Sequence, residues 1–286
     1  MALDGVPDPV PKLDARQFVL ELNQQTGAGL RFDGPAADGE VGAAFVRWPD
    51  GRNGVLTRGA GSLADLRRTA GVLAAARQGG LPVPRYELLA ELPSGVGIVQ
   101  ERLPGRPPAT VDRALLQSMI ELTDRFAGLA PDLPVPSMYL VESGPGFCLH
   151  ESLRRYDDRT RRLLDWIHQV GRDEPSGMSG DDLVHLDFHT GNVLTEAGEI
   201  TGIVDWDGIG RGDRRFALVT LRFDAYWRLP GQNLEWFDEL LETVLTPELL
   251  RLYWAHMSLR QVDWAIRHHG PSDVDRWLTF AATCMD

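Results

Sequence analysis

The sequence predicts an α+β protein of two lobes, in which a small β-rich lobe precedes a larger, mainly helical one. Short β-prone segments separated by turn residues fill most of the first hundred positions. Residues 104–108 read PGRPP, which is the composition expected of a boundary between compact regions. The segments that follow are long and have helical spacing, apart from one β-prone central stretch. We therefore expect one lobe at residues 1–103 and the other at residues 104–286.

The elements of the first lobe follow from local patterns. Phe18, Val19 and Leu22 have helical spacing behind Asp14, a candidate N-cap, and Ser62 with Asp65 resembles a capping box. The Pro-Asp-Gly sequence at 49–51 and the Pro-Ser-Gly sequence at 93–95 have the chemistry of turns. We expect helices at Leu13 to Gln25 and Ser62 to Ala76, and strands at Gly39 to Trp48, Gly54 to Arg58, Tyr86 to Ala90 and Gly97 to Leu103.

The second lobe is expected to hold helices around a central stretch. The helices are predicted near residues 111–129, 149–170, 213–228, 233–245, 247–268 and 273–283. Residues 184–207, VHLDFHTGNVLTEAGEITGIVDWD, contain two β-prone segments joined by the four-residue connection 196–199. A hairpin centred on Ala197-Gly198 would place Asn192 opposite Ile203. Asn192 and Asp205 would then be diagonal neighbours, about 7–8 Å apart at most.

The polar residues of this stretch suit phosphoryl transfer. That reaction asks the protein to position a nucleophile and to neutralise charge on phosphate groups. Asn192 and Asp205 offer the oxygen ligands that Mg²⁺ prefers. Asp187, on the incoming loop, can accept a hydrogen bond from a substrate hydroxyl and take its proton. We therefore interpret the stretch as the candidate active site.

Composition excludes several classes of protein. The net charge of −12 and the absence of a basic stripe argue against nucleic acid as a partner. The two cysteines, Cys148 and Cys284, are expected to be reduced thiols. The N-terminal residues lack the apolar core of a signal peptide, and no apolar run reaches the length of a membrane span. We expect a cytoplasmic protein that is a monomer or a weak dimer and has no membrane partner.

Two other interpretations of the function remain open at this point. His185 and His189 are four residues apart and, with Asp187 and Asp205, would suit a metal-dependent hydrolase, although the segment reads as strand and loop rather than helix. A nucleotide-binding module without catalytic activity is the second. The glycines at 59 and 61 lie between a strand and a helix but lack the third glycine of a dinucleotide-binding turn, so we interpret them as the connection into that helix.

The central residues resemble the aminoglycoside phosphotransferase family, which has a two-lobed protein-kinase-like fold. The family pattern is H-x-D, an Asn five residues later, an apolar strand ending in D-x-D, and then G-D. This chain has His185-Leu186-Asp187, Asn192, Asp205-Trp206-Asp207 and Gly212-Asp213. The resemblance implies ATP or GTP as donor, Mg²⁺, and the hydroxyl of a small molecule as acceptor. It implies Asp187 as catalytic base and Asn192 and Asp205 as metal ligands, with the first lobe binding the nucleotide.

The chain departs from the family pattern in the first lobe. The family has a Lys or an Arg on the third strand, where it grips the phosphates and pairs with a helix Glu. Arg58 is the matching cation here, and Thr69 falls where the Glu is expected, with Asp65 one turn earlier as a substitute. The hinge between the lobes would correspond to Gln100, Glu101 and Leu103, whose backbone groups would hold the purine.

The family acts on several acceptors: aminoglycosides, basic peptide antibiotics such as viomycin and capreomycin, macrolides, and the metabolites choline, homoserine and sugars. The acidity of the chain favours a cationic acceptor and therefore an antibiotic O-phosphotransferase that confers resistance. A metabolic small-molecule kinase is the alternative. The acidic residues that could line the acceptor pocket are Glu151, Asp157, Asp158, Asp224 and Asp263.

Overall fold

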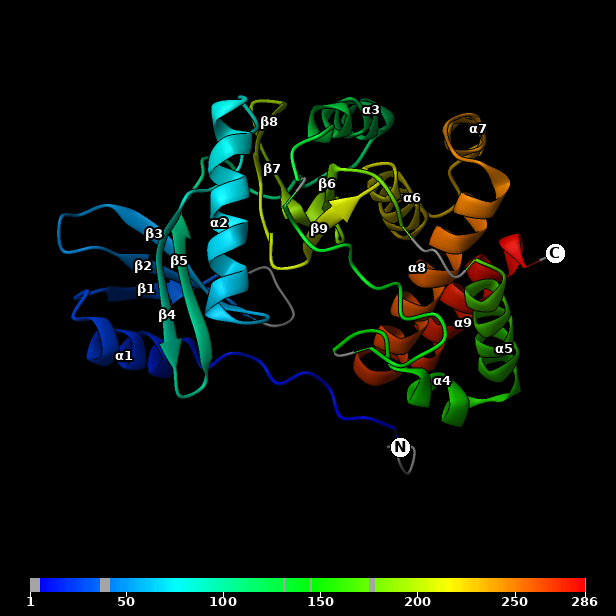
Figure 1. The fold of residues 1–286 in the computed structure, drawn as a ribbon, viewed down its shortest axis with the longest axis horizontal. Helices are drawn as coiled ribbons and strands as arrows, with labels where there is room; N and C mark the ends of the chain where they lie inside the picture. Colours follow the sequence, from blue (N-terminus) through cyan, green and yellow to red (C-terminus); the bar gives the residue numbers. More distant parts are fainter. Residues whose placement is uncertain (1–5, 37–41, 131, 145, 175–177, 286) are drawn as a thin grey trace. The chain divides into compact units, whose positions relative to one another are not determined.

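The structure is a computed structural model that describes residues 6–36, 42–130, 132–144, 146–174 and 178–285 (Figure 1). The chain forms two compact units, each assembled from separated stretches. The first, called the sheet unit below, consists of Pro11–Pro134 and Asp181–Ala217. The second, called the helical unit, consists of Val135–Gly180 and Leu218–Asp286 together with the residues up to Val10. The predicted central stretch therefore belongs to the sheet unit.

The sheet unit contains a five-stranded antiparallel sheet with the strand order β1-β2-β3-β5-β4. The strands are β1 (Arg31–Pro35), β2 (Ala44–Arg47), β3 (Asn53–Gly59), β4 (Tyr86–Leu92) and β5 (Gly95–Glu101). Two helices accompany them, α1 (Ala15–Thr26) and α2 (Leu63–Gln78). The strand β1 was not predicted. The predicted strand from Gly39 to Trp48 begins outside the described residues, and its described part is β2.

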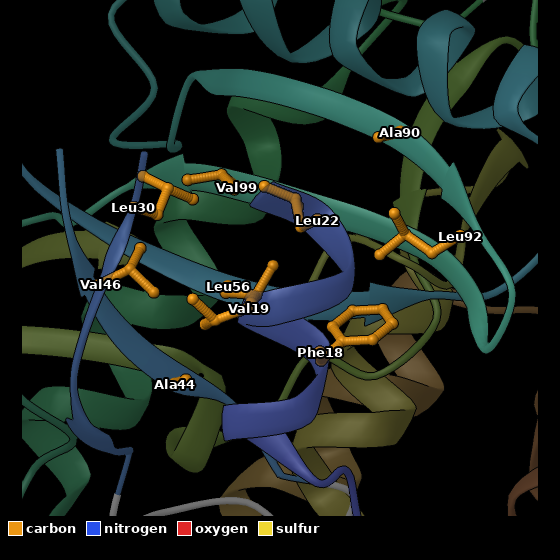
Figure 2. Close-up of a cluster of buried hydrophobic side chains, with 10 residues drawn as sticks. All are labelled: Phe18, Val19, Leu22, Leu30, Ala44, Val46, Leu56, Ala90, Leu92 and Val99. Atoms are coloured by element: carbon orange, nitrogen blue, oxygen red, sulfur yellow. The ribbon is translucent and has the colours of Figure 1, made fainter. Parts of the chain in front are cut away.

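The two faces of this sheet pack against different helices. Phe18, Val19 and Leu22 of α1 pack on one face, where strand side chains complete a buried cluster (Figure 2). The strand members of that cluster are Ala44, Val46, Leu56, Ala90, Leu92 and Val99. Leu66 of α2 packs on the opposite face against Val96 and Ile98. Because successive strand residues alternate between faces, the helix that a side chain meets is set by its position in the strand.

Helix α2 begins as the sequence predicts. The Ser62 hydroxyl accepts a hydrogen bond from the Asp65 N–H, and the Asp65 carboxylate accepts one from the Ser62 N–H, which completes the capping box. Asp14 likewise caps α1 by accepting a hydrogen bond from the Gln17 N–H.

The rest of the sheet unit carries the central stretch. After α3 (Arg113–Thr123) and the short helix η1 (Asp124–Phe126), the chain returns to this unit as two small antiparallel pairs. One pair joins β6 (Asp182–His185) to β9 (Ile209–Gly212), and the other joins β7 (Val193–Glu196) to β8 (Glu199–Ile203). Arg106, in the segment predicted as a boundary, forms an isolated bridge with Thr195 of β7.

The helical unit consists of helices and their connections in the described residues. Its helices are α4 (His150–Tyr156), α5 (Asp158–Asp173), most of α6 (Phe216–Arg228), α7 (Glu235–Val244), α8 (Pro247–His268), α9 (Pro271–Ala281) and the short η3 (Ala282–Cys284). The single helix predicted near 149–170 is in fact two, because Asp157 adopts an extended conformation and caps α5. Within the described ranges, no helix combines the length and apolar character needed to cross a membrane.

An α+β protein with an N-terminal antiparallel sheet and a largely helical C-terminal part is therefore confirmed. The predicted division of roles at residues 103 and 104 stays a prediction.

Candidate active site

The β7–β8 hairpin has the predicted turn but not the predicted register. Glu196 pairs with Glu199 around Ala197 and Gly198, which both have positive φ angles of +52° and +88°. Farther along the hairpin the pairing shifts, so that Val193 rather than Asn192 lies opposite Ile203. The expected register was wrong by one residue at this end.

The shift arises from an irregularity in the ladder between Leu194 and Thr195. The partner strand has one additional residue there, Thr201. Its hydroxyl donates hydrogen bonds to the carbonyl oxygens of Pro104 (2.8 Å) and Leu194 (3.3 Å). As a consequence, the carbonyl oxygen of Asn192 accepts a hydrogen bond from the Val204 N–H at 2.9 Å, which places Asn192 beside the residue that precedes Asp205.

Asn192 is held with its amide oxygen available to a ligand. Its Nδ2 donates a hydrogen bond to the carbonyl oxygen of Asp187 at 2.9 Å. A carbonyl oxygen only accepts, so the amide nitrogen must face Asp187 and Oδ1 must face away. The residue is only 8% exposed, which restricts the side chain to this orientation. The structure thus joins the predicted base and one predicted metal ligand directly.

His185 fixes the loop that carries Asp187. Its Nδ1 accepts a hydrogen bond from the Asp187 N–H at 3.2 Å, so the ring proton lies on Nε2. That nitrogen lies 3.0 Å from the carbonyl oxygen of Val204 and donates to it. The buried imidazole therefore bridges the loop of Asp187 and the strand end that leads to Asp205. Since both ring nitrogens are used, His185 is not placed to bind a metal.

His189 contacts the side chain of Asp187. The His189 Nδ1 accepts a hydrogen bond from the Gly191 N–H at 3.0 Å, which leaves the proton on Nε2. This Nε2 lies 3.4 Å from Oδ2 of Asp187. The Asp187 side chain remains 36% exposed, so a substrate can still reach it. From the sequence, His189 was considered only as a possible metal ligand, and its contact with Asp187 was missed.

Buried aromatic rings pack together beneath the loop that carries Asp187 and the turn that carries Asp205. His185 and Trp206 have ring centroids 4.5 Å apart, and Phe126 of η1 lies 5.8 Å from Phe188 and 6.0 Å from Trp206. The Trp206 Nε1–H also donates a hydrogen bond to the carbonyl oxygen of Ile203 at 2.7 Å. All four rings are fully buried. Only the aromatic character of Phe126 could have drawn attention to it in the sequence, where it lies 59 residues before His185.

Asp205 occupies a strained turn at the end of β8. Its φ angle of +63° lies in the left-handed region, which non-glycine residues rarely adopt but which Asp tolerates better than most. The conformation turns the chain so that Asp205 is exposed while Trp206 is buried. Strain of this kind costs on the order of 1–3 kcal/mol and is concentrated at functional sites.

Asp207 lies in a more enclosed environment than Asp205. Burial, reinforced by the negative charge of Asp205, raises the pKa of Asp207 to about 7, although a hydrogen bond from the Ala60 N–H acts in the opposite direction. Burial, followed by the charges of Asp207 and Asp205, also raises the pKa of Tyr86 on β4 well above its usual range. Asp205 and Asp207 therefore lie close to Tyr86 of β4, and Asp207 also lies close to Ala60, which follows β3.

The predicted hinge lies at the end of β5. Gln100 is buried in the sheet, and the Glu101 carboxylate forms an ion pair with Arg77 at 2.8 Å. Leu103 lies close to Gly202 of β8, where a Cβ would come within 2.9 Å of the Leu103 side chain. Gln100 is thus buried and Glu101 is paired, and the role of their backbone groups at the hinge stays a prediction.

Arg58 lies on the face of the five-stranded sheet that packs against α1. Leu56 belongs to the cluster under α1, and Arg58 follows it by two residues on the same face of β3. Its Nη2 donates a hydrogen bond to the carbonyl oxygen of Pro11, and its Cδ lies against Gly95. Within the described parts of the chain Arg58 forms no ion pair, and Asp65 instead pairs with Arg68. The strand residue that faces α2 is Thr57, opposite Ile98.

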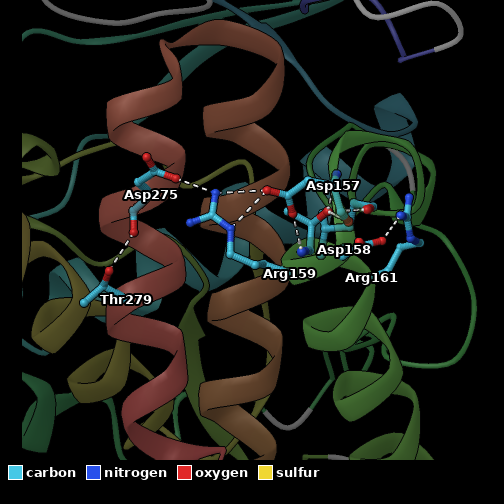
Figure 3. Close-up of polar contacts among 8 residues, drawn as sticks. Asp157, Asp158, Arg159, Arg161, Asp275 and Thr279 are labelled. Atoms are coloured by element: carbon cyan, nitrogen blue, oxygen red, sulfur yellow. Dashed lines mark hydrogen bonds and ion pairs between the residues drawn. The ribbon is translucent and has the colours of Figure 1, made fainter.

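Two of the candidate acceptor residues, Asp157 and Asp158, begin helix α5 (Figure 3). Asp157 accepts hydrogen bonds from the Thr160 N–H and from Arg159, whose Nη2 lies 2.9 Å away. Arg159 also pairs with Asp275 of α9 at 2.6 Å. Asp158 pairs with Arg161. Both carboxylates therefore have arginine partners within the helical unit.

The other three candidates are also paired with arginines. Glu151 pairs with Arg154 and Arg155, and Asp224 lies 3.5 Å from Arg228. Asp263 is fully buried and pairs with Arg267 at 2.7 Å.

The burial of Asp263 corrects its assignment as an acceptor-binding residue. Ser152 donates a hydrogen bond to its carboxylate, and Arg267 extends the network to the carbonyl oxygen of Gly146 at 2.6 Å. A carboxylate enclosed in this way is not accessible to a ligand. It instead joins α4, α8 and the segment before α4.

Comparison with known proteins identifies the family of this chain and several relatives. The model of the phosphotransferase enzyme family matches residues 35–253. Hygromycin-B 4-O-kinase of Escherichia coli is 31% identical over 81 residues, which are 28% of this chain. The match spans only 24% of that relative's length.

Solved structures show the same fold over nearly the whole chain. A thermostable mutant of aminoglycoside phosphotransferase APH(4)-Ia, in a ternary complex with AMP-PNP and hygromycin B, is 18% identical, with a TM-score of 0.67 and coverage of 92% of this chain and 96% of that one. Amicoumacin kinase hAmiN, in complex with AMP-PNP, Ca²⁺ and Ami, is 17% identical, with a TM-score of 0.65 and coverage of 96% and 94%. The predicted kinase-like architecture is thereby confirmed, and the chain belongs to the phosphotransferase enzyme family.

Proposed function

We propose that this phosphotransferase moves the γ-phosphate of ATP or GTP to a hydroxyl group of a cationic antibiotic, either an aminoglycoside or a basic peptide of the viomycin and capreomycin type. The observation that carries the proposal is the direct hydrogen bond between Asn192 Nδ2 and the Asp187 carbonyl oxygen, beside the strand end that leads to Asp205. It joins a candidate base and a candidate metal ligand in the arrangement that phosphoryl transfer needs.

Asp187 is assigned the role of catalytic base. Its carboxylate is partly exposed, so the acceptor hydroxyl can donate a hydrogen bond to it and be aligned for attack on the γ-phosphate. His189 Nε2 orients the carboxylate through Oδ2, and the hydrogen bond to His185 holds the backbone of the same residue. The acceptor proton passes to Asp187 as the new O–P bond forms, while the bond between the γ-phosphorus and the bridging oxygen breaks and the nucleoside diphosphate leaves.

Asn192 and Asp205 are assigned to Mg²⁺. The residues fit this ion because the Asn192 amide oxygen faces away from Asp187 and because Asp205 offers an exposed carboxylate; both are hard oxygen donors. Bound Mg²⁺ would neutralise part of the phosphate charge. One or two protein ligands are the usual number when substrate phosphates supply the others.

The purine is assigned to the backbone of the hinge at Gln100, Glu101 and Leu103. The solved relatives include complexes with AMP-PNP and with GDP, so members of this fold bind either purine. Gln100 is buried and Glu101 is paired with Arg77, and backbone groups can recognise the edge of a base without either side chain.

The geometry does not support a metal-dependent hydrolase. That interpretation needs His185 as a ligand, whereas both of its ring nitrogens are hydrogen-bonded to backbone groups. Moreover, in the parts of the chain that the structure describes, no three His, Cys, Asp or Glu side chains are grouped to hold a metal ion.

A metabolic small-molecule kinase is the second candidate function. It is favoured by the arginine partners of Glu151, Asp157, Asp158, Asp224 and Asp263, since these carboxylates are not ready-made sites for a polycation. The cationic acceptor is favoured by the relatives, whose solved complexes contain hygromycin B, streptomycin and kanamycin.

The test is a screen of acceptor-dependent nucleotide consumption with Mg²⁺ and either ATP or GTP. The acceptors are hygromycin B, kanamycin, streptomycin, capreomycin, viomycin, choline and homoserine. We expect turnover with one cationic antibiotic and a phosphate monoester in the product by ³¹P NMR. The Asp187→Ala variant serves as the matched negative control. Turnover with choline or homoserine alone would move the enzyme to the metabolic class. Binding of nucleotide without turnover on a broad acceptor panel would favour the inactive module.

A further inference from the structure

The ion pair that the family resemblance leads one to expect between β3 and α2 is replaced by two threonines. Thr57 is the β3 residue that faces α2, because it lies opposite Ile98, which packs against Leu66 of α2. Thr69 follows Leu66 by three residues and is likewise buried, so it lies on the same side of the helix. Both charges of the expected pair are therefore absent together, and neither position leaves a buried charge unpaired.

This replacement leaves the nucleotide phosphates without a cation from the strand. A nucleoside triphosphate carries several negative charges, and phosphoryl transfer depends on their neutralisation. A metal ion supplies part of the positive charge, and in this fold a basic side chain supplies more. Arg58 lies on the face that packs against α1, so it is not placed to provide that charge.

Helix α2 provides a different cation at the right place. Arg68 lines a cavity of about 90 Å³ in the sheet unit together with Ala60, Thr69 and Asp207. Asp207, which lines the cavity with Ala60, follows the proposed metal ligand Asp205 by two residues. The cavity therefore adjoins the place where the metal and the phosphates are expected. Of the basic side chains in the described residues, only Arg68 lines it.

The position of Arg68 is controlled by the start of its own helix. Its guanidinium pairs with Asp65, three residues earlier, and Asp65 is held by the N–H and the hydroxyl of Ser62. The side chain is about half exposed, so a phosphate group can reach it. A guanidinium can bind phosphate oxygens through two parallel N–H donors.

We propose that Arg68 of α2 makes the contact with the nucleotide phosphates that a strand cation makes elsewhere in the family, and that Asp65 positions its guanidinium. This inference rests on the proposed function, because it requires a nucleoside triphosphate at the site. The positive charge that binds the phosphates then comes from helix α2 instead of strand β3, and the contact between β3 and α2 is uncharged.

The test measures binding directly by calorimetry, with Mg²⁺-ATP, Mg²⁺-GTP and the nucleoside corresponding to the purine that binds better. We expect Arg68→Ala to weaken triphosphate binding by about 10- to 100-fold, since charge-assisted hydrogen bonds are lost. The affinity for the nucleoside should not change, because the purine contact is elsewhere. Arg68→Lys should recover the affinity only in part. Arg67→Ala removes the adjacent exposed arginine and should bind like the wild type.

A gain-of-function variant completes the test. Thr57→Lys with Thr69→Glu, introduced into Arg68→Ala, should restore at least part of the triphosphate affinity by recreating the strand cation. Thermal unfolding of each variant checks the fold, and Arg68→Gln replaces Arg68→Ala if the latter is unstable. Wild-type affinity in a folded Arg68 variant would overturn the inference and leave the proposed function intact. A wild-type protein that binds no nucleoside triphosphate would overturn both.

Discussion

The carboxylates of the candidate active site and the acidic residues expected to line the acceptor pocket are held by different kinds of partner. The Asp187 carboxylate lies 3.4 Å from Nε2 of His189, and the Asp207 carboxylate lies near the Ala60 N–H. Asp157, Asp158 and Asp263 are paired with arginines of their own unit. Neutral partners orient a carboxylate while preserving its charge for a ligand, whereas an arginine partner consumes that charge. Acidity alone is therefore a poor guide to which carboxylates bind substrate.

The largest expected effect is on stability, at Asp263. In Asp263→Ala the fully buried Arg267 loses its partner, and breaking one side of a buried pair costs about 3–5 kcal/mol. Urea unfolding followed by circular dichroism measures this loss. Asp158→Ala, which removes an exposed carboxylate with its own arginine partner, is the control and should lose far less. Equal losses in the two variants would contradict the contrast between buried and exposed pairs.

The next effect is on turnover, at Asp187. Removing the proposed base in Asp187→Ala should lower kcat by about 10²- to 10⁴-fold, while nucleotide affinity stays close to the wild-type value. Steady-state kinetics with the acceptor identified by the screen, together with nucleotide calorimetry, separates the two quantities. His189→Gln should cause a smaller fall in kcat, because the histidine only orients the carboxylate. A folded Asp187→Ala enzyme with normal turnover would remove this residue from the mechanism.

A third effect concerns the neutral histidines of the helical unit. Burial, followed by the charge of Arg260, lowers the pKa of His256 to about 3, although a hydrogen bond to the Met138 carbonyl oxygen acts in the opposite direction. The unfolded chain takes up a proton at this residue below about pH 6.5, and the folded chain does not until about pH 3, so stability must fall as the pH decreases through that window.

His256 alone is expected to lower the free energy of unfolding by about 2 kcal/mol at pH 5 relative to pH 7. His150 and His168 add to it, because burial is also the main cause that lowers the pKa of each. Urea unfolding at the two pH values measures the difference, and His256→Gln should show a smaller one. Stability that rises on acidification from pH 7 to pH 5 would have the wrong sign for neutral buried histidines.

The smallest effect is expected at Arg58, and it decides between two assignments. The sequence assigns Arg58 to the phosphates, which predicts weaker nucleotide binding in Arg58→Ala. Its position on the α1 face predicts a change of less than about twofold, because the side chain is partly exposed and its one hydrogen bond among the described residues, to the Pro11 carbonyl oxygen, is 3.3 Å long. Calorimetry with Mg²⁺-ATP is the measurement. A loss of tenfold or more would restore Arg58 as a phosphate ligand.

Much of the fold was accessible from the sequence because it depends on local signals. The capping box at Ser62 and Asp65, the turn at Ala197 and Gly198, and the spacing of Phe18 and Leu22 each involve residues close in the chain. Each was predicted at the position where the structure has it.

The features that were missed depend on single residues or on contacts distant in sequence. The additional residue Thr201 shifts the hairpin register, and its reason is a hydrogen bond to Pro104, nearly a hundred positions away. Whether Thr57 or Arg58 faces α2 depends on which face of β3 packs against α1. A sequence such as Val-Leu-Thr-Arg does not reveal which of its alternating side chains lie on that face. The pairing of Asp263 with Arg267 follows helical spacing, but its burial depends on how α4 packs against α8.

The left-handed backbone of Asp205 affects how this enzyme can evolve in the laboratory. Glycine adopts that conformation without strain, so a selection for heat resistance alone would accept Asp205→Gly and reward it. The same substitution removes the carboxylate assigned to Mg²⁺. Stabilised libraries of this chain will therefore drift toward inactive members at position 205 unless activity is selected in parallel.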